Sequence, residues 1–143
     1  MRSKLFTLGL LFCAAGCGDN LVSVSGKVTL NDKPLPNATV IFHPHSEKPN
    51  PGPGSHGKTN DKGEFTLTLM TREVNGAVPG KHKVSITAYE GDDKVPSSGS
   101  DMKVFGKALV PEKYNGKTEL TFDVPAGGTT SANFDLKTTS TPK

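Results

Sequence analysis

The 143-residue chain has no tryptophan, only two tyrosines and only two cysteines. Its 17 basic and 14 acidic residues nearly balance, and no basic run is interleaved with aromatic residues. The electrostatic pattern of a nucleic-acid-binding protein is therefore missing. No apolar run approaches the roughly 20 residues that a helix needs to cross a bilayer. These shortages exclude a nucleic-acid partner and a helical membrane span.

The amino terminus has the organisation of a secretory signal. Arg2 and Lys4 form a positive head, and the apolar segment 5–15 follows it. That length fits the hydrophobic region of a signal peptide rather than a membrane span. The segment ends in Ala14-Ala15-Gly16-Cys17. We therefore expect the chain to be exported.

The four residues Ala14-Ala15-Gly16-Cys17 resemble the lipobox of bacterial lipoproteins, although Ala14 stands where that family most often has leucine. The resemblance implies cleavage before Cys17 and attachment of a diacylglycerol to its thiol. Residues 1–16 are then a lipoprotein signal peptide and residues 17–21 a lipidated linker. The membrane is thus one partner, and the protein is placed in the cell envelope, facing the periplasm or the exterior. An ordinary cut near Ala15 would instead release a soluble protein.

After residue 21, apolar and polar residues alternate with period two, which is typical of strands with one buried face. No segment shows a helical period. At least six strands are predicted, and two sheets packed face to face are the simplest way to bury their apolar faces. Gly26 interrupts the first apolar face and predicts a bulge or a close backbone approach. The predicted inward positions are Val22, Val24, Val28, Leu30, Ala38, Val40, Phe42, Phe65, Leu67, Leu69, Val84, Ile86, Ala88, Leu120, Phe122, Val124, Ala132, Phe134 and Leu136.

Turn residues separate these strands. Asn31-Asp32, Gly63 and Pro79-Gly80 stand where tight turns are expected, because glycine, asparagine and aspartate tolerate a left-handed backbone. Two stretches, 44–57 and 91–107, are polar or rich in proline and glycine and are predicted to be loops. Within the second, Val104-Phe105 is a possible short edge strand. Residues 138–143 are predicted to form a flexible tail.

Four segments resemble carboxypeptidase regulatory-like domains. They are VSGKVTLNDKPL at 24–35, ATVIF at 38–42, TNDKGEF at 59–65 and VPGKHKV at 78–84. The resemblance implies a seven-stranded immunoglobulin-like or transthyretin-like antiparallel β-sandwich over residues 22–137, with a docking or display role. The family's Asp-Gly turn is replaced by Asn31-Asp32, which predicts a longer first loop. The family resemblance also implies that Tyr114 packs at a corner of the sandwich.

Few residues offer chemistry. His43 and His45 share one strand face and lie near His56 in the sequence, so these three are the candidates for a metal site. His82 is in phase with Val84, and we expect a partly buried residue at a strand edge. No G-x-S-x-G nucleophile elbow occurs. The sequence predicts no catalytic residue, no cofactor and no metal, and its one site residue is Cys17.

The functional prediction is a membrane-anchored, non-catalytic envelope lipoprotein. Its sandwich is expected to serve as a structural or protein-interaction module with a protein partner in the envelope. One alternative is a periplasmic metal-binding protein that uses His43, His45 and His56. The other is a transthyretin-like hydrolase, for which His82 is the available base.

Overall fold

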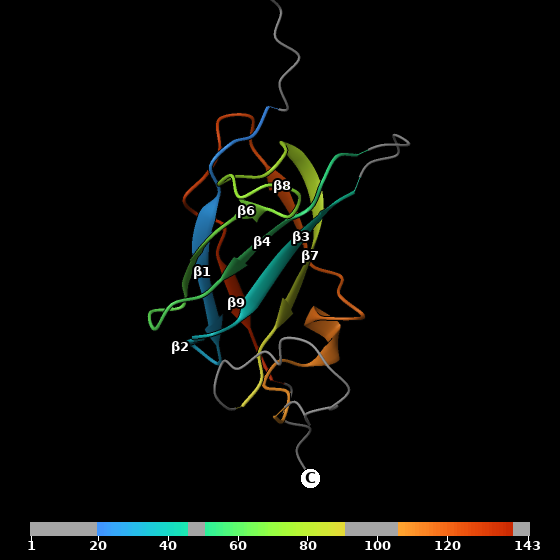
Figure 1. Ribbon diagram of the computed structural model, residues 1–143. Helices are drawn as coiled ribbons and strands as arrows, with labels where there is room; N and C mark the ends of the chain where they lie inside the picture. The colour runs from blue at the N-terminus through green and yellow to red at the C-terminus, as the bar shows by residue number, and fades with distance from the viewer. Residues whose placement is uncertain (1–19, 46–50, 91–105, 139–143) are drawn as a thin grey trace, which may run out of the picture.

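The computed structural model describes residues 20–45, 51–90 and 106–138 (Figure 1). They form strands in two sheets and one short 3₁₀ helix, η1 (Glu112–Tyr114). The predicted all-β class and the two packed sheets are confirmed. In this part of the chain, no helix is long and apolar enough to cross a membrane. The signal peptide, Cys17 and the strand suggested at Val104-Phe105 lie outside the described residues.

The first sheet is built around β1 (Ser25–Leu30). β2 (Lys33–Pro34) and β5 (Glu64–Thr66) pair with β1 in antiparallel register. β9 (Phe134–Leu136) also pairs with β1, but in parallel register, with Val28 opposite Phe134. The sequence resemblance implied a wholly antiparallel sandwich. The first sheet is instead mixed, because β9 runs in the same direction as β1.

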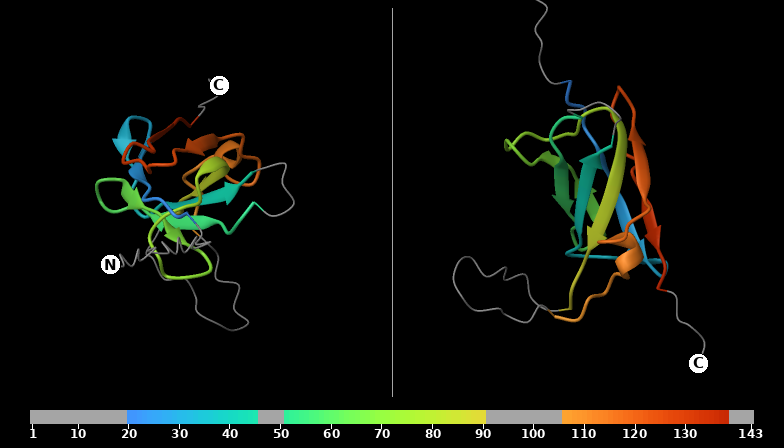
Figure 2. Two further views of the ribbon diagram at one scale, coloured as in Figure 1. Left: turned by 90° about the horizontal axis from the view of Figure 1, so that it is seen from above. Right: turned by 90° about the vertical axis from the view of Figure 1, so that its right-hand side faces the viewer.

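The second sheet has the order β6-β4-β3-β7-β8 and is antiparallel throughout. Its central strands are β3 (Thr39–Pro44) and β7 (Gly80–Thr87), and its edges are β6 (Thr68–Leu69) and β8 (Thr121–Val124). The views in Figure 2 show the two sheets as layers, with the strands of each running along the length of the molecule.

β4 (Ser55–Lys58) begins within the stretch 44–57 that was predicted to be a loop, so that prediction is wrong for residues 55–57. Its inward residues are Ser55 and Gly57, both buried. A β-carbon on Gly57 would lie 2.6 Å from the carbonyl oxygen of Thr66. Because the neighbouring strand comes so close, this strand buries small residues and shows no apolar alternation.

The alternating segment 64–69 was predicted to be one strand, but it belongs to both sheets. β5 pairs with β1 in the first sheet, and β6 pairs with β4 in the second. Leu67 lies between them, fully buried, and its N–H donates to the carbonyl of Val24. The chain thus crosses from the first sheet to the second at Leu67, whose side chain points into the core like those of Phe65 and Leu69.

The first hairpin has a two-residue loop, so the longer loop predicted from the sequence is wrong. Leu30 pairs with Lys33, which leaves Asn31 and Asp32 as the loop, and their φ angles are 51° and 65°. Positive φ at both central residues is the type I′ conformation, whose twist matches that of the flanking strands. Asparagine and aspartate tolerate this conformation, so no glycine is required.

The core is a single cluster between the sheets, and it contains nearly all of the predicted inward residues together with Leu35, Ala77 and Val110, which the alternation did not predict. All of the predicted inward residues are buried except Val22, Leu30, Leu120 and Phe122, which are partly buried against the cluster. At its centre, the Phe42 ring lies 5.7 Å from that of Phe122 and 6.0 Å from that of Phe134. Tilted and edge-on pairs of this kind add to the free energy of burial.

Candidate functional site

The three histidines proposed as metal ligands have exposed side chains, and His43 and His56 lie on the outer face of the second sheet. His43 is in β3, His45 follows that strand, and His56 is in β4, paired with Ile41. The sequence had suggested that His56 is in a loop, but it lies in a strand. Within residues 20–45, 51–90 and 106–138, no three His, Cys, Asp or Glu side chains lie close enough to hold one ion. The metal alternative thus receives no support from the geometry.

One serine lies near a histidine on this face. The Oγ of Ser85 is 3.4 Å from Nε2 of His43, and both side chains are on the surface of the sheet. A nucleophile needs a base at hydrogen-bond distance and a third group that orients the base. The contact is long and lies on an open strand surface, so it does not form such an arrangement.

His82 is completely buried, and the prediction of a partly buried residue at a strand edge is wrong. β7 lies between β3 and β8, and His82 pairs with Pro44 on one side and Phe122 on the other. Its side chain is 1% exposed and its ring packs 5.6 Å from that of Phe42. A hydrolase would need this base to reach a substrate, and the fold encloses it.

The hydrogen bonding of His82 fixes its protonation. Nδ1 lies 2.9 Å from the carbonyl oxygen of Gly80, and because a carbonyl only accepts, Nδ1 carries the proton. Nε2 is buried and has no hydrogen-bond partner. Burial lowers the pKa of His82, and the Gly80 carbonyl and the charge of Asp123 oppose that shift only in part. The ring is therefore neutral in the folded protein at pH 7.

We predict that acid destabilises the fold through His82. Its pKa is lower in the folded than in the unfolded chain, so the unfolded chain takes up the proton first. The free energy of unfolding should be level above about pH 6.5 and should fall as the pH drops below that value. Urea unfolding between about pH 7.5 and pH 5 measures this dependence, in a range where few carboxylates titrate.

The variant His82→Phe should abolish most of that pH dependence, since phenylalanine does not titrate. His56→Gln is the matched control because it removes an exposed histidine from the same sheet. Equal slopes for His82→Phe and the unmodified protein would contradict the assignment.

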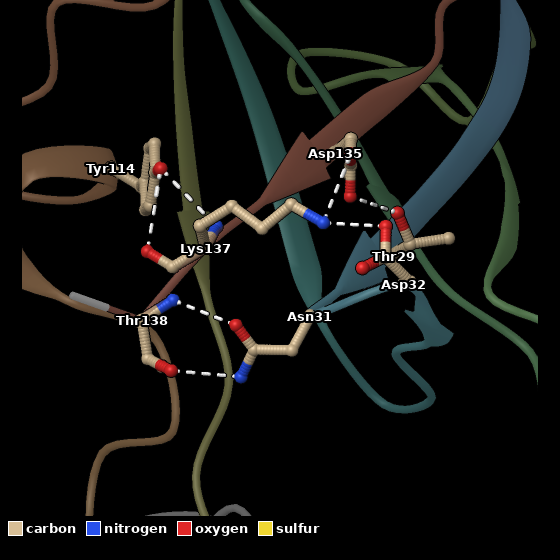
Figure 3. A network of polar contacts seen from close by, with 7 residues as sticks. All are labelled: Thr29, Asn31, Asp32, Tyr114, Asp135, Lys137 and Thr138. Carbon is tan, nitrogen blue, oxygen red and sulfur yellow. Dashed lines mark hydrogen bonds and ion pairs between the residues drawn. The ribbon is translucent and has the colours of Figure 1, made fainter. Parts of the chain in front are cut away.

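A polar network joins the end of the chain to the first hairpin (Figure 3). Lys137 forms ion pairs with Asp32 and Asp135, and Thr29 donates to Asp135 at 2.8 Å. The Tyr114 hydroxyl accepts from the backbone N–H of Lys137 at 3.2 Å. Tyr114 is partly buried against the core at the end of η1, where the sequence resemblance placed a corner residue.

Asn31 completes this network. Its Oδ1 accepts from the N–H of Thr138 at 3.0 Å, and its Nδ2 donates to the Thr138 hydroxyl at 2.7 Å. Thr138, the first residue of the predicted flexible tail, is thus held against the hairpin, and residues 139–143 lie outside the described residues. Sequence reasoning missed these contacts because the partners are 107 residues apart and share no local pattern. The network fixes β9 beside β1.

We predict that Asn31→Ala lowers the free energy of unfolding by about 2 kcal/mol. Alanine loses both hydrogen bonds to Thr138 and resists the positive φ of this position. Asn31→Gly loses the same bonds but accepts the backbone conformation, so its cost should be about 1 kcal/mol. Urea unfolding of both variants measures the difference, and equal losses would show that the turn conformation carries no cost.

A shallow, open depression of about 520 Å³ lies beside β1 and β5. Its lining includes Asn60 and Glu64, whose polar groups are engaged with each other: Asn60 Nδ2 donates to Glu64 Oε2 at 3.2 Å, and Asn60 Oδ1 accepts from the N–H of Glu64 at 2.9 Å. These bonds close the turn that precedes β5. The residues that line the depression include no histidine or cysteine beside their hydroxyl groups.

No protein-family model, no curated protein and no solved structure matches this chain. The resemblances to the lipobox and to carboxypeptidase regulatory-like domains therefore rest on the sequence motifs alone. The fold defines the chain as an all-β protein of two packed sheets.

Proposed function

We propose that this protein is an exported lipoprotein whose β-sandwich is held at a membrane by lipid on Cys17. The observation that carries the proposal is the order of features at the amino terminus: a positive head, an eleven-residue apolar segment, and small residues directly before a cysteine. Two or three acyl chains on one residue hold a protein stably at a bilayer, whereas a single chain does not.

The position of Cys17 next to the folded region supports the proposal. Asn20 is the first described residue, and Val22 already exchanges two backbone hydrogen bonds with Ala77, each 3.0 Å long. An acylated Cys17 would therefore stand three residues before Asn20. This arrangement suits a tether that places the sandwich directly at a lipid surface.

We further propose that the sandwich is of the seven-stranded immunoglobulin-like or transthyretin-like type and serves as a structural or protein-binding module. Seven of the described strands have three or more residues: β1, β3, β4, β5, β7, β8 and β9. A passive role agrees with the buried His82 and with the polar network, which ties the chain to itself. The partner is expected to be another envelope protein.

The test is membrane partition after export. Cys17→Ser should move the protein from the membrane fraction to the soluble fraction or leave an uncut precursor, because serine cannot form the thioether to diacylglycerol. Cys13→Ser is the matched control, since that cysteine lies within the predicted signal and leaves with it.

The fractions are separated by ultracentrifugation after a salt wash and compared on immunoblots. Full membrane retention of a processed Cys17→Ser protein would refute the proposed anchor. Retention of Cys13→Ser together with loss of Cys17→Ser is the predicted pattern.

A further inference from the structure

The described chain begins at one end of the sandwich, which we call the amino-terminal end. It is formed by residues 21–24, 51–54, 70–79 and 125–131. These segments contact one another directly: Val22 pairs with Ala77, Ser23 accepts from the N–H of Thr129 at 2.9 Å, and the N–H of Met70 donates to the carbonyl of Gly54 at 2.9 Å. Figure 1 shows the start of the described chain at the end of the molecule away from the arrowhead of β1.

Large apolar side chains are exposed at this end. Met70 is 47% exposed and Val74 is 45% exposed, and both lie in the same turn after β6. The third exposed large apolar residue among the described residues, Tyr89, is 42% exposed but lies at the opposite end, after the last residue of β7. Leu21 and Val78 are partly buried beside this turn. Exposed apolar groups gathered at one place on a protein mark a surface that meets a protein or a lipid.

The same end is nearly free of charge. Within its four described segments, the only charged residues are Arg72 and Glu73. The opposite end carries many more, in its turns, in β2 and in η1, namely Asp32, Lys33, Asp61, Lys62, Glu112, Lys113 and Lys117. Withdrawing charged groups from water is costly, whereas withdrawing apolar ones is favourable. Of these two ends, judged by their described residues, the amino-terminal end therefore has the composition that suits contact with a lipid surface.

The chain length before Asn20 determines which surface lies within reach. If Cys17 carries lipid, the three residues from Cys17 to Asn20 span at most about 10 Å even when fully extended. The amino-terminal end then stays close to the bilayer that holds the tether. A second molecule would have to enter that narrow space, whereas the bilayer is already there.

We propose that the amino-terminal end rests on the bilayer that holds the lipid tether, with Met70 and Val74 entering the interfacial region. This inference rests on the proposed lipidation of Cys17. The tether and the turn that holds Met70 and Val74 together give two points of contact, so the sandwich has a fixed orientation, with its charged end directed away from the membrane.

The absence of tryptophan makes the orientation measurable. Met70→Trp places a single fluorophore in the turn after β6, and Val74→Trp provides a second reporter should the first variant fold poorly. Tyr89→Trp is the control at the far end. Each full-length, processed protein is reconstituted into vesicles of phosphatidylethanolamine and phosphatidylglycerol, with and without bromine on the acyl chains. Bromine quenches tryptophan only at close approach.

We expect the emission of Met70→Trp and Val74→Trp to shift to the blue in vesicles and to lose most of its intensity with brominated lipid. The emission of Tyr89→Trp should not change. Cosedimentation of the same samples reports lipid anchoring separately. A protein that sediments with vesicles but shows no quenching at residues 70 and 74 refutes the inference and leaves the anchor intact. A processed protein that does not sediment refutes both.

Discussion

Phe42→Ala is expected to lower the free energy of unfolding by about 3–5 kcal/mol. The ring is fully buried, lies within 6.0 Å of the rings of His82, Phe122 and Phe134, and so connects residues of both sheets. Alanine leaves a cavity that these rings cannot fill, because the strands that carry them are each held in place by pairing to a neighbouring strand. A loss of this size is a large part of the stability of an ordinary domain.

Urea unfolding followed by circular dichroism measures the loss. Ile41→Ala is the matched control: it removes an aliphatic side chain from the same strand on the outer face, where Ile41 is only partly buried. Its cost should be about 1 kcal/mol. Comparable losses for the two variants would contradict the assignment of the core to the space between the sheets.

Gly26→Ala is expected to cost about 3 kcal/mol or more, although it adds one carbon. That β-carbon would lie 2.0 Å from the carbonyl oxygen of Ala132 and 2.9 Å from its Cα. The obstructing atoms belong to the backbone before β9, whose N–H at Ala132 donates to the carbonyl of Ser25 at 3.1 Å. A flexible side chain could move aside, but here β1 and this segment must separate.

Gly127→Ala is the control, because no atom lies within 4 Å of the β-carbon it would add. Its effect on the unfolding midpoint should be small, with a slight stabilisation from the reduced freedom of the unfolded chain. Similar midpoints for Gly26→Ala, Gly127→Ala and the unmodified protein would show that β1 and the segment before β9 do not approach as described.

The period-two pattern predicted the core well because each strand buries one face only. Phe65, Leu67 and Leu69 kept the inward phase even though the chain changes sheets between them. Alternation records which way a side chain points and not which strand lies beside it. The crossing at Leu67 and the parallel pairing of β9 with β1 depend on distant partners, so no local pattern could reveal them.

The failures have physical causes of the same kind. β4 was missed because a close neighbour restricts its inward positions to Ser55 and Gly57. His82 was placed at an edge because a histidine next to a turn has the pattern of a surface residue. β7 is an inner strand because β8 pairs with it, and the β8 residue opposite His82, Phe122, comes 40 residues further along the chain. The Asn31 contacts with Thr138 likewise join opposite ends of the sequence.

The predicted site was testable in part. The sequence placed His43, His45 and His56 near one another. The register sets His43 and His56 on one sheet face, and His45 lies just beyond β3, but the three do not converge as a metal requires. Cys17 depends on a processing signal, which is read by enzymes in an extended chain and leaves no trace in a folded domain. Its role therefore remains a prediction from the amino-terminal sequence.

The most direct test of the lipid anchor is mass spectrometry of the exported protein after proteolysis. The account predicts an amino-terminal peptide that begins at Cys17 and carries the added mass of a diacylglycerol on its thiol, with or without a further acyl group on its amine. A mature peptide that begins at another residue, or an amino-terminal Cys17 with a free thiol, would contradict it.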